Sequence, residues 1–135
     1  MILADTSGLL ALLDEGEPDH AAVTKLVKRE PGPLLVTDFV LAETDFLVLD
    51  RLGARAERDF LAQLSVGALL REPITANDLT RAIEISTDYL DQEFGLTDAT
   101  LMALAERLGR PVLTLDRRHF TTFRTKKGKP LRLLP

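Results

Sequence analysis

The chain alternates short apolar runs with longer segments of helical character, and this alternation restricts its fold more than any other feature of the sequence. The apolar runs are three or four residues long, rich in Leu, Ile and Val, and bounded by helix-start or turn residues. Short buried strands that alternate with helices are typical of an α/β domain whose sheet is mostly parallel. The sequence therefore predicts an α/β fold with a central sheet of about five strands.

Turn and helix signals set the expected boundaries. The expected strands are 2–5, 34–36, 68–71, 112–115 and, at an edge, 131–134. The expected helices are one after residues 6–7, then 18–30, 38–52, 54–66, one that begins at 75–77 and ends near 89, and 98–109. No repeat or interdomain linker interrupts this pattern, so we expect residues 1–135 to form one domain.

Polar residues at the expected helix starts supply capping groups, whose oxygens accept a hydrogen bond from an otherwise unpaired backbone N–H. Thr6 or Ser7 can cap the first helix. Thr37 precedes the helix over 38–52, and Thr97 precedes the last helix.

The composition excludes several classes of protein. The chain has no Cys, which excludes disulfide frameworks, zinc–thiolate sites and thiol nucleophiles. No apolar run approaches the roughly 20 residues of a membrane span. The N-terminal residues enter an expected core strand without a basic region, so we expect no signal peptide, and a cytoplasmic location is compatible with these features.

Two acidic residues follow expected strands. Asp5 ends the run ILAD, and Asp116 follows VLTL. The carboxyl ends of parallel strands meet at one edge of a sheet, where such folds bind ligands. The alternative is a helix cap for Asp5 and a turn residue before Arg117 for Asp116. Because Thr6 and Ser7 already offer caps, a functional role is favoured for Asp5.

Two further acidic residues lie on expected helices among apolar neighbours. Glu43 has Phe46 and Leu47 three and four positions away, which predicts a carboxylate on the buried stripe of its helix. Its alternatives are pairing with an arginine or a place at the edge of the stripe. Asp98 lies in a first helical turn, where the helix dipole also favours an acid, but it shares its face with Leu101.

These four acids are expected to meet above one edge of the sheet and to hold a cation. Carboxylates about 6 Å apart repel by roughly 3 kcal/mol per pair at an effective dielectric near 20. Oxygen ligands, with no Cys and only two His, suit Mg²⁺ or Mn²⁺ rather than zinc. Such an ion activates water and neutralises a phosphoryl group, so the natural reaction is phosphodiester hydrolysis, with one carboxylate available as a general base.

The net charge of −4 hides a basic C-terminal segment. Residues 110–135 carry eight basic residues and one acid, whereas residues 1–109 carry nine basic residues and 20 acids. The eight are Arg110, Arg117, Arg118, Arg124, Lys126, Lys127, Lys129 and Arg132. The segment predicts contact with a polyanion, whose phosphates basic side chains on the rim of the acidic site would hold. The alternative is a solvated tail that balances the acidic remainder.

The order of these motifs resembles a known family. DTS, an apolar helix carrying Glu43, LTDATLMALAERLG and VLTLDRRHF together are similar to a PIN-domain nuclease of the VapC type, the toxin half of bacterial toxin–antitoxin pairs. The resemblance covers almost the whole chain and is loosest around Glu43. It implies a three-layer α/β/α domain and a Mg²⁺- or Mn²⁺-dependent endoribonuclease that cuts single-stranded or loop RNA, with transfer and ribosomal RNA loops as plausible targets.

The resemblance also implies partners and site residues. It implies inhibition by a cognate VapB-type antitoxin and a homodimer, for which 18–30 and 38–66 are the candidate helices. By position, the family's catalytic, metal-binding acids are Asp5, Glu43, Asp98 and Asp116, and its supporting hydroxyls are Ser7 and Thr114. Thr114 lies on the same side of its strand as Asp116, so its hydroxyl can orient a carboxylate. The candidate RNA contacts are Arg117, Arg118, Lys126 and Lys127.

One stretch departs from the family. Some members carry a further acid shortly after the last Asp, where this chain has Arg117, Arg118 and His119. A second metal is therefore expected to bind weakly or only with RNA. His119 is expected to contact a phosphate or to pack its ring rather than to catalyse, and His20, in an acidic turn, is expected to be solvated.

Three alternatives remain. An aspartyl phosphatase of the haloacid-dehalogenase type also places an Asp after its first strand, but it needs a second acid at the position of Ser7 and a core lysine. A catalytically inactive binding module is disfavoured by the complete set of four acids. A nuclease of ribosomal RNA maturation is disfavoured by the small size, without an added RNA-binding domain.

Overall fold

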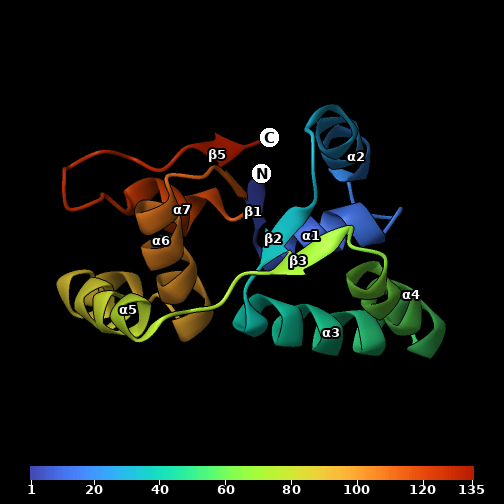
Figure 1. Ribbon diagram of the computed structural model, residues 1–135, viewed down its shortest axis with the longest axis horizontal. Helices are drawn as coiled ribbons and strands as arrows, with labels where there is room; N and C mark the ends of the chain where they lie inside the picture. The colour runs from blue at the N-terminus through green and yellow to red at the C-terminus, as the bar shows by residue number, and fades with distance from the viewer.

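The computed structural model describes residues 1–135 and contains one five-stranded sheet (Figure 1). The strands are β1 (Ile2–Ala4), β2 (Leu34–Val36), β3 (Leu69–Arg71), β4 (Val112–Leu113) and β5 (Leu133–Leu134). Their order is β3-β2-β1-β4-β5, and every neighbouring pair is parallel. The expected parallel α/β architecture is therefore confirmed.

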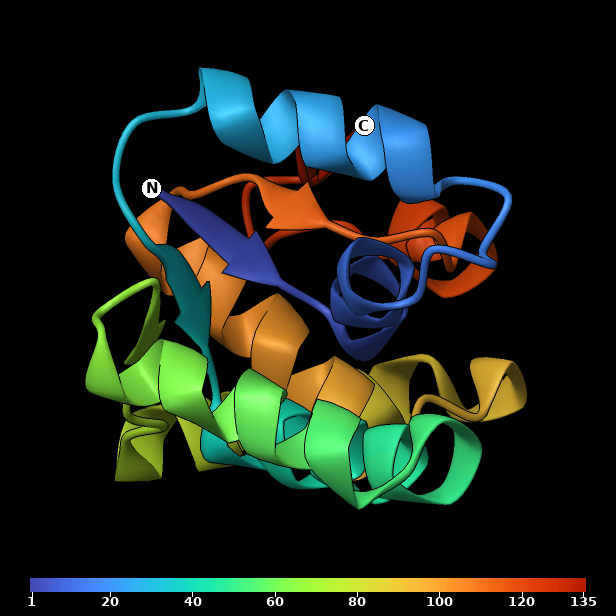
Figure 2. The ribbon, with the colours of Figure 1, turned by 90° about the vertical axis from the view of Figure 1, so that its right-hand side faces the viewer.

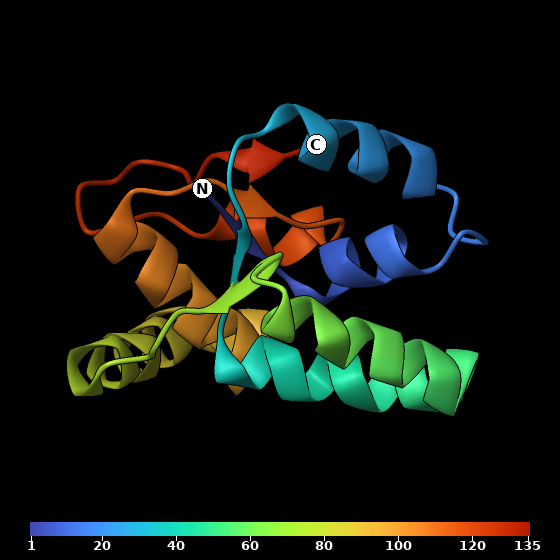
Figure 3. The ribbon, with the colours of Figure 1, turned by 45° about the vertical axis from the view of Figure 1, so that its right-hand side comes forward.

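Seven α-helices and a short 3-10 helix surround the sheet. They are α1 (Thr6–Leu13), α2 (His20–Arg29), α3 (Asp38–Leu52), α4 (Ala54–Ser65), α5 (Ala76–Asp88), η1 (Leu90–Gln92), α6 (Leu96–Leu108) and α7 (Arg117–Thr122). In Figure 1, α5 and α6 lie on one side of the sheet and α1 and α2 on the other, which gives three α/β/α layers. Figures 2 and 3 show α3 and α4 packed side by side. No helix combines the length and the apolar character needed to span a membrane.

The strand order reverses at β1, and this reversal positions the site. The chain runs from β1 to β2 and β3 on one side, then crosses to β4 and β5 on the other. At such a switch point the connections leave neighbouring strands in opposite directions, which opens a crevice at their carboxyl ends. Asp5 follows β1 directly, and Asp116 lies three residues beyond the end of β4.

The helix α6 forms the centre of the core on its side of the sheet. Every residue from Ala99 to Ala105 is buried. On the other side, Gly8 brings α1 against the end of β4, because a Cβ there would lie 2.7 Å from the carbonyl oxygen of Leu113. Both helices are therefore fixed where they approach the crevice.

The expected cap Thr37 is confirmed, and the helix expected to begin at 75–77 is capped as well. The amide of Val40 donates to Thr37 Oγ1 (3.1 Å) at the start of α3. At the start of α5, the amide of Asp78 donates to Thr75 Oγ1 (3.1 Å), and the Asp78 carboxylate accepts from the Thr75 amide (2.9 Å). This reciprocal capping box makes Thr75 the cap of α5, at the first position of the expected range 75–77.

The caps expected for α1 (Thr6 or Ser7) and for α6 (Thr97) are wrong. Because β1 passes into α1 without a loop, the cap position falls on Asp5, the last extended residue, and Thr6 and Ser7 already belong to the helix. In α6 the extended residue is Gly95, so Thr97 lies in the first turn. In the sequence, a Ser or Thr in the first turn of a helix cannot be told from one at the cap position, because each comes just after the end of an extended segment.

Other differences concern short or local features. The sequence did not predict α7 or η1, which are too short to show helical periodicity. His20 is not fully solvated: it is half-buried, and its Nδ1 lies 2.7 Å from the carbonyl oxygen of Ala11. This contact joins the start of α2 to α1, so the segment between the two helices is held against the core although its acidic sequence predicted exposure.

Candidate active site

The four acids singled out in the sequence line a single cleft of about 500 Å³. Asp5 comes from the end of β1, Glu43 from α3, Asp98 from the first turn of α6 and Asp116 from the segment after β4. We call this the acidic cleft. It lies at the carboxyl edge of the sheet, at the point where the strand order reverses.

Asp5 is buried, with 4% of its surface exposed. Its Oδ2 accepts hydrogen bonds from Thr114 Oγ1 (2.8 Å) and Ser7 Oγ (3.1 Å). Burial raises the pKa of the Asp5 carboxyl; the two hydroxyls act in the opposite direction, and the charge of Glu43 raises the pKa further. The site therefore holds Asp5 in one orientation while making its negative charge unfavourable without a cation.

The two hydroxyl residues also tie the ends of β1 and β4 together. Ser7 Oγ lies 3.2 Å from Thr114 Oγ1 and accepts the amide of Leu115 (2.9 Å). Thr114 Oγ1 accepts the amide of Asp116 (3.0 Å). Thr114 thus contacts Asp5 through its hydroxyl and positions the backbone of Asp116, so one buried side chain orients two of the acids.

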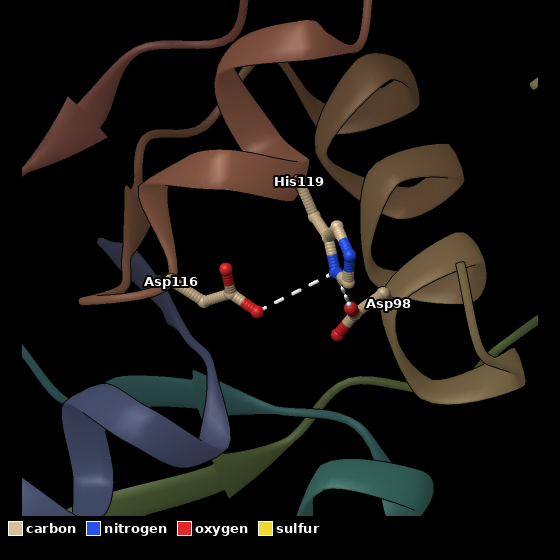
Figure 4. Close-up of side chains that lie close together, drawn as sticks. All are labelled: Asp98, Asp116 and His119. Atoms are coloured by element: carbon tan, nitrogen blue, oxygen red, sulfur yellow. Dashed lines mark hydrogen bonds and ion pairs between the residues drawn. The ribbon is translucent and has the colours of Figure 1, made fainter. Parts of the chain in front are cut away.

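Asp98, Asp116 and His119 form a compact cluster, of which the two acids line the acidic cleft (Figure 4). One potential ligand atom from each lies within 4.8 Å of the others. The pKa of Asp98 is raised to about 6: burial and then the charge of Asp5 raise it most, the charge of Asp116 adds to them, and the hydrogen bond with His119 acts in the opposite direction. Two negative charges thus act on a third, which is the electrostatic pattern expected of a cation site.

His119 lies nearer the acids than the sequence indicated. Its Nδ1 is 3.1 Å from Asp98 Oδ2 and 3.4 Å from Asp116 Oδ2. The ring also packs edge-on against Phe94, with centroids 5.2 Å apart. The expected packing of the ring is present, but the contact with both acids was missed. The spacing of three residues between Asp116 and His119 would have indicated it only if α7 had been predicted.

Glu43 is placed differently from expectation. Its helix buries Val40, Thr44 and Val48, and Glu43 is exposed beside this stripe. Phe46, which was expected to mark a buried face, is 67% exposed. Of the two placements left open by the sequence, Glu43 takes the one at the edge of the stripe and not the buried one, because apolar residues of α3 occur on two faces and only one of them meets the core. Its side chain nevertheless lines the acidic cleft.

The candidate RNA contacts fall into two groups. Arg117 and Arg118 begin α7, directly after Asp116, and both are exposed. Lys126 and Lys127 instead line a different pocket, beside Pro111 at the amino end of β4. These two lysines do not lie on the rim of the acidic cleft, because the chain between α7 and β5 returns to the opposite edge of the sheet, and their contact with RNA stays a prediction.

The donor chemistry of the acidic cleft fits a divalent metal ion. The four acids offer carboxylate oxygens, and His119 adds one imidazole nitrogen beside Asp98 and Asp116. The pKa values of Asp5 and Asp98 are raised, so nearby positive charge would favour their ionised forms. Asp98, Asp116 and His119 offer ligand atoms close enough together to hold such an ion, and Asp5 lines the same cleft. The cleft contains no lysine, which leaves the phosphatase alternative without its required residue.

A sequence model of the PIN domain matches residues 2–125 of this chain. The chain belongs to the PIN-domain family. The parallel five-stranded sheet agrees with the architecture that the sequence resemblance implied, and the four acids that it singled out line one cleft.

The relatives within this family are VapC proteins. The chain is 41% identical to ribonuclease VapC26 of Mycobacterium tuberculosis over 135 residues, which is 99% of this chain and 100% of that protein. It is 30% identical to the 23S rRNA-specific endonuclease VapC20 of the same organism over 110 residues, 81% of this chain and 83% of that protein.

Solved structures give the same result for the fold. The crystal structure of M. tuberculosis VapC20, a toxin that cleaves the sarcin–ricin loop, superposes with a TM-score of 0.78 at 26% identity, covering 87% of this chain and 91% of that one. A toxin–antitoxin complex from Klebsiella pneumoniae superposes with a TM-score of 0.70 at 18% identity, covering 89% and 90%.

Proposed function

We propose that this protein is the toxin of a toxin–antitoxin pair and a Mg²⁺- or Mn²⁺-dependent endoribonuclease that hydrolyses phosphodiester bonds in RNA. The observation that carries the proposal is the acidic cleft, in which four carboxylates from separate elements meet at the switch point of the sheet. Its VapC relatives, one of them a ribonuclease by name and one a ribosomal RNA endonuclease, support the choice of RNA as substrate.

The protein groups divide the work as follows. When bound, a divalent ion supplies an activated water and neutralises charge on the scissile phosphate. Asp5, Asp98 and Asp116 hold that ion, and Ser7 and Thr114 keep Asp5 in the orientation it needs.

A second set of groups handles protons and flanking charge. Glu43, exposed at the mouth of the cleft, is free to accept a proton from the attacking water. His119 holds Asp98 and Asp116 in register through its Nδ1. Arg117 and Arg118, beside Asp116, meet phosphates next to the cleaved bond.

The substrate we favour is a loop in ribosomal RNA, with a transfer RNA loop as the second choice. Support comes from the 23S rRNA specificity in the name of VapC20, which aligns with 81% of this chain. The acidic cleft is open and polar, which suits an unpaired strand rather than the buried phosphates of a duplex groove.

The proposed partners follow from the same family. A VapB-type antitoxin is the proposed inhibitor, and the Klebsiella structure of similar fold is itself a toxin–antitoxin complex. A homodimer through α3 is also proposed, since Phe46, Leu49 and Leu52 expose apolar surface on that helix. We propose that residues 1–135 act as one nuclease domain in the cytoplasm, where its RNA targets reside.

Cleavage assays test the function directly. The purified, antitoxin-free protein is incubated with 23S rRNA and with mixed transfer RNA, in Mg²⁺, in Mn²⁺ or in EDTA. We expect metal-dependent cuts at a few positions, reduced at least about a hundredfold by Asp98→Asn. The matched control is Asp88→Asn, which removes an exposed acid from α5. Cuts that survive EDTA or Asp98→Asn would refute the metal site.

A further inference from the structure

A second charged pocket lies outside the proposed active site. It has a volume of about 550 Å³ and lies between the end of α6, the start of β4 and the loop before β5. Five cations line it: Arg110, Lys126, Lys127, Lys129 and Arg132. We call it the basic pocket. It shares no residue with the acidic cleft.

Most of these cations have no partner within the protein. Lys126 Nζ approaches Glu84 at 3.7 Å. The one acid in the wall, Glu106, already pairs with Arg81 (2.8 Å) and accepts the backbone amide of Lys126 (2.8 Å). The other four basic side chains form no ion pair or side-chain hydrogen bond. In a protein of net charge −4, they converge without neutralisation, which favours an anion from outside.

The basic pocket lies at the opposite end of the sheet from the acidic cleft. Asp98 at the start of α6 faces the cleft, whereas Glu106, eight positions later on the same helix, faces the pocket. At 1.5 Å per residue, about 12 Å of helix separates the two. An RNA of several nucleotides is long enough to reach both, since a nucleic-acid strand advances roughly 3.4 Å per phosphate.

We propose that the basic pocket binds backbone phosphates of the RNA substrate at a distance from the cleaved bond, in the stem that flanks the loop. This rests on the proposed nuclease function and deepens it. The residues that line the pocket favour a polyanion over an amphipathic protein segment as its occupant, because the only apolar residues among them are Ala105, Leu131 and two prolines. Phosphate contacts at this site fix position and add affinity without reading sequence.

The test compares two triple variants of equal charge. Lys127→Ala/Lys129→Ala/Arg132→Ala removes three unpaired cations from the basic pocket. Lys25→Ala/Lys28→Ala/Arg29→Ala, on α2, removes three elsewhere. KM and kcat are measured on a 23S rRNA stem-loop and on its loop alone, from 50 to 200 mM salt, and circular dichroism checks folding.

For the stem-loop, we expect the first variant to raise KM about tenfold, to leave kcat unchanged and to flatten the slope of log KM against log salt by about 2 to 3. The α2 variant and the loop-only RNA should show neither change. The proposal would be overturned if the two triple variants changed KM equally, or if the first variant raised KM for the loop-only RNA as much as for the stem-loop. It would also be overturned if the first variant weakened only antitoxin binding. Fluorescence anisotropy of the stem-loop in EDTA measures RNA binding without cleavage, so it tests the basic pocket separately. If the wild-type protein cleaves no RNA, that result refutes the nuclease function but not binding at the pocket.

Discussion

Asp98 carries an electrostatic cost that a stability measurement can detect. Burial and the nearby charges raise the pKa of its carboxyl from 3.8 to about 6 in the folded protein. The folded state therefore binds the proton more tightly than the unfolded state, and stability falls as pH rises from about 4 to about 6. Above pH 6 the penalty is complete.

Asp98→Asn removes this penalty. In EDTA at pH 8 we expect the free energy of unfolding to rise by roughly 1–3 kcal/mol, with the gain vanishing near pH 4, where the wild-type carboxyl is already neutral. Urea denaturation at pH 4, 6 and 8 measures it, with Asp88→Asn as the exposed control. A gain that is the same at all three pH values would show that charge is not its source.

The hydroxyl of Thr114 should matter for metal binding more than for folding. Thr114→Val keeps the shape but removes the donor to Asp5 and the acceptor for the Asp116 amide. We expect Mn²⁺ affinity, measured by calorimetry, to fall about 10- to 100-fold. Thr100→Val is the control, because that hydroxyl is equally buried but bonds only to its own helix. Equal metal affinities in the two variants would remove the positioning role.

At the residue scale, the sequence predicted which acids line the cleft better than it predicted their exposure and their side-chain contacts. Asp5 follows β1 directly, as predicted, because a strand end is a local feature, whereas Asp116 lies three residues beyond β4, which ends earlier than the sequence indicated. The exposure of Glu43 was not predictable, since apolar residues on α3 such as Phe46 occupy a face that the core does not use. The contact of His119 with the acids depends on the backbone of α7, which carries no periodic signal of its own.

The contact between α1 and β4 makes Gly8 a test of how elements set the site. A Cβ there would lie 2.7 Å from both the carbonyl oxygen and the Cγ of Leu113, so α1 must move to accommodate it. We expect Gly8→Ala to lower the free energy of unfolding by about 1–3 kcal/mol. Cleavage should fall even below the unfolding temperature, because Ser7 moves with the helix.

The matched control for this change is Gly16→Ala. There a Cβ meets only the flexible side chain of Asp14, so thermal unfolding and cleavage should remain near wild type. If Gly8→Ala is as stable and active as Gly16→Ala, the close packing of α1 on β4 does not position the site.

The helices α5 and α6 are joined by an ion pair with a defined pH dependence. Burial alone would raise the pKa of Asp78, but hydrogen bonds from Arg107 and Thr75 outweigh it, and the pKa is lowered from 3.8. A lowered pKa gives stability that is present above about pH 4 and is lost as pH falls below that value.

Asp78→Asn should therefore destabilise the protein at pH 7 by about 2 kcal/mol and make no difference near pH 2. Denaturation in urea between pH 2 and pH 7 measures this, with Asp88→Asn as the control on the exposed face of α5. A cost that persists undiminished at pH 2 would mean that shape, not charge, explains the effect.

At the element scale, long helices were more predictable than their first residues. The capping box of Thr75 with Asp78 has a sequence signature, and its helix was placed correctly. The starts of α1 and α6 were displaced, because hydroxyl residues there serve the acidic cleft or the helix interior rather than the cap. Ser7 is an example: its hydroxyl bonds to Asp5 and to the Leu115 amide.

For the whole molecule, metal binding should appear as added stability. An ion that binds only the folded state at 100 times its dissociation constant stabilises it by about 2.7 kcal/mol. For a chain of 135 residues this corresponds to a rise in Tm of roughly 5–10 °C. We expect saturating Mn²⁺ to produce that rise in the wild-type protein and none in Asp98→Asn/Asp116→Asn. An equal rise in both, at matched ionic strength, would exclude the cleft as the site.

The global arrangement was partly predictable. Alternating strands and helices gave the parallel sheet, but the strand order depends on crossovers between segments far apart in the chain. The position of the basic loop shows the limit: residues 117 and 126 are close in sequence, yet they serve opposite edges of the sheet.

The burial of α6 has a consequence for how this protein can be switched off. Residues from Ala99 to Ala105 are each at most 2% exposed, so α6 cannot melt without dismantling the core on its side of the sheet. Their amide protons should therefore exchange with solvent only through global unfolding. Because Asp98 lies on this helix, local unfolding cannot displace its carboxylate while the rest of the fold stays intact. Inhibition therefore requires a separate molecule that covers the acidic cleft.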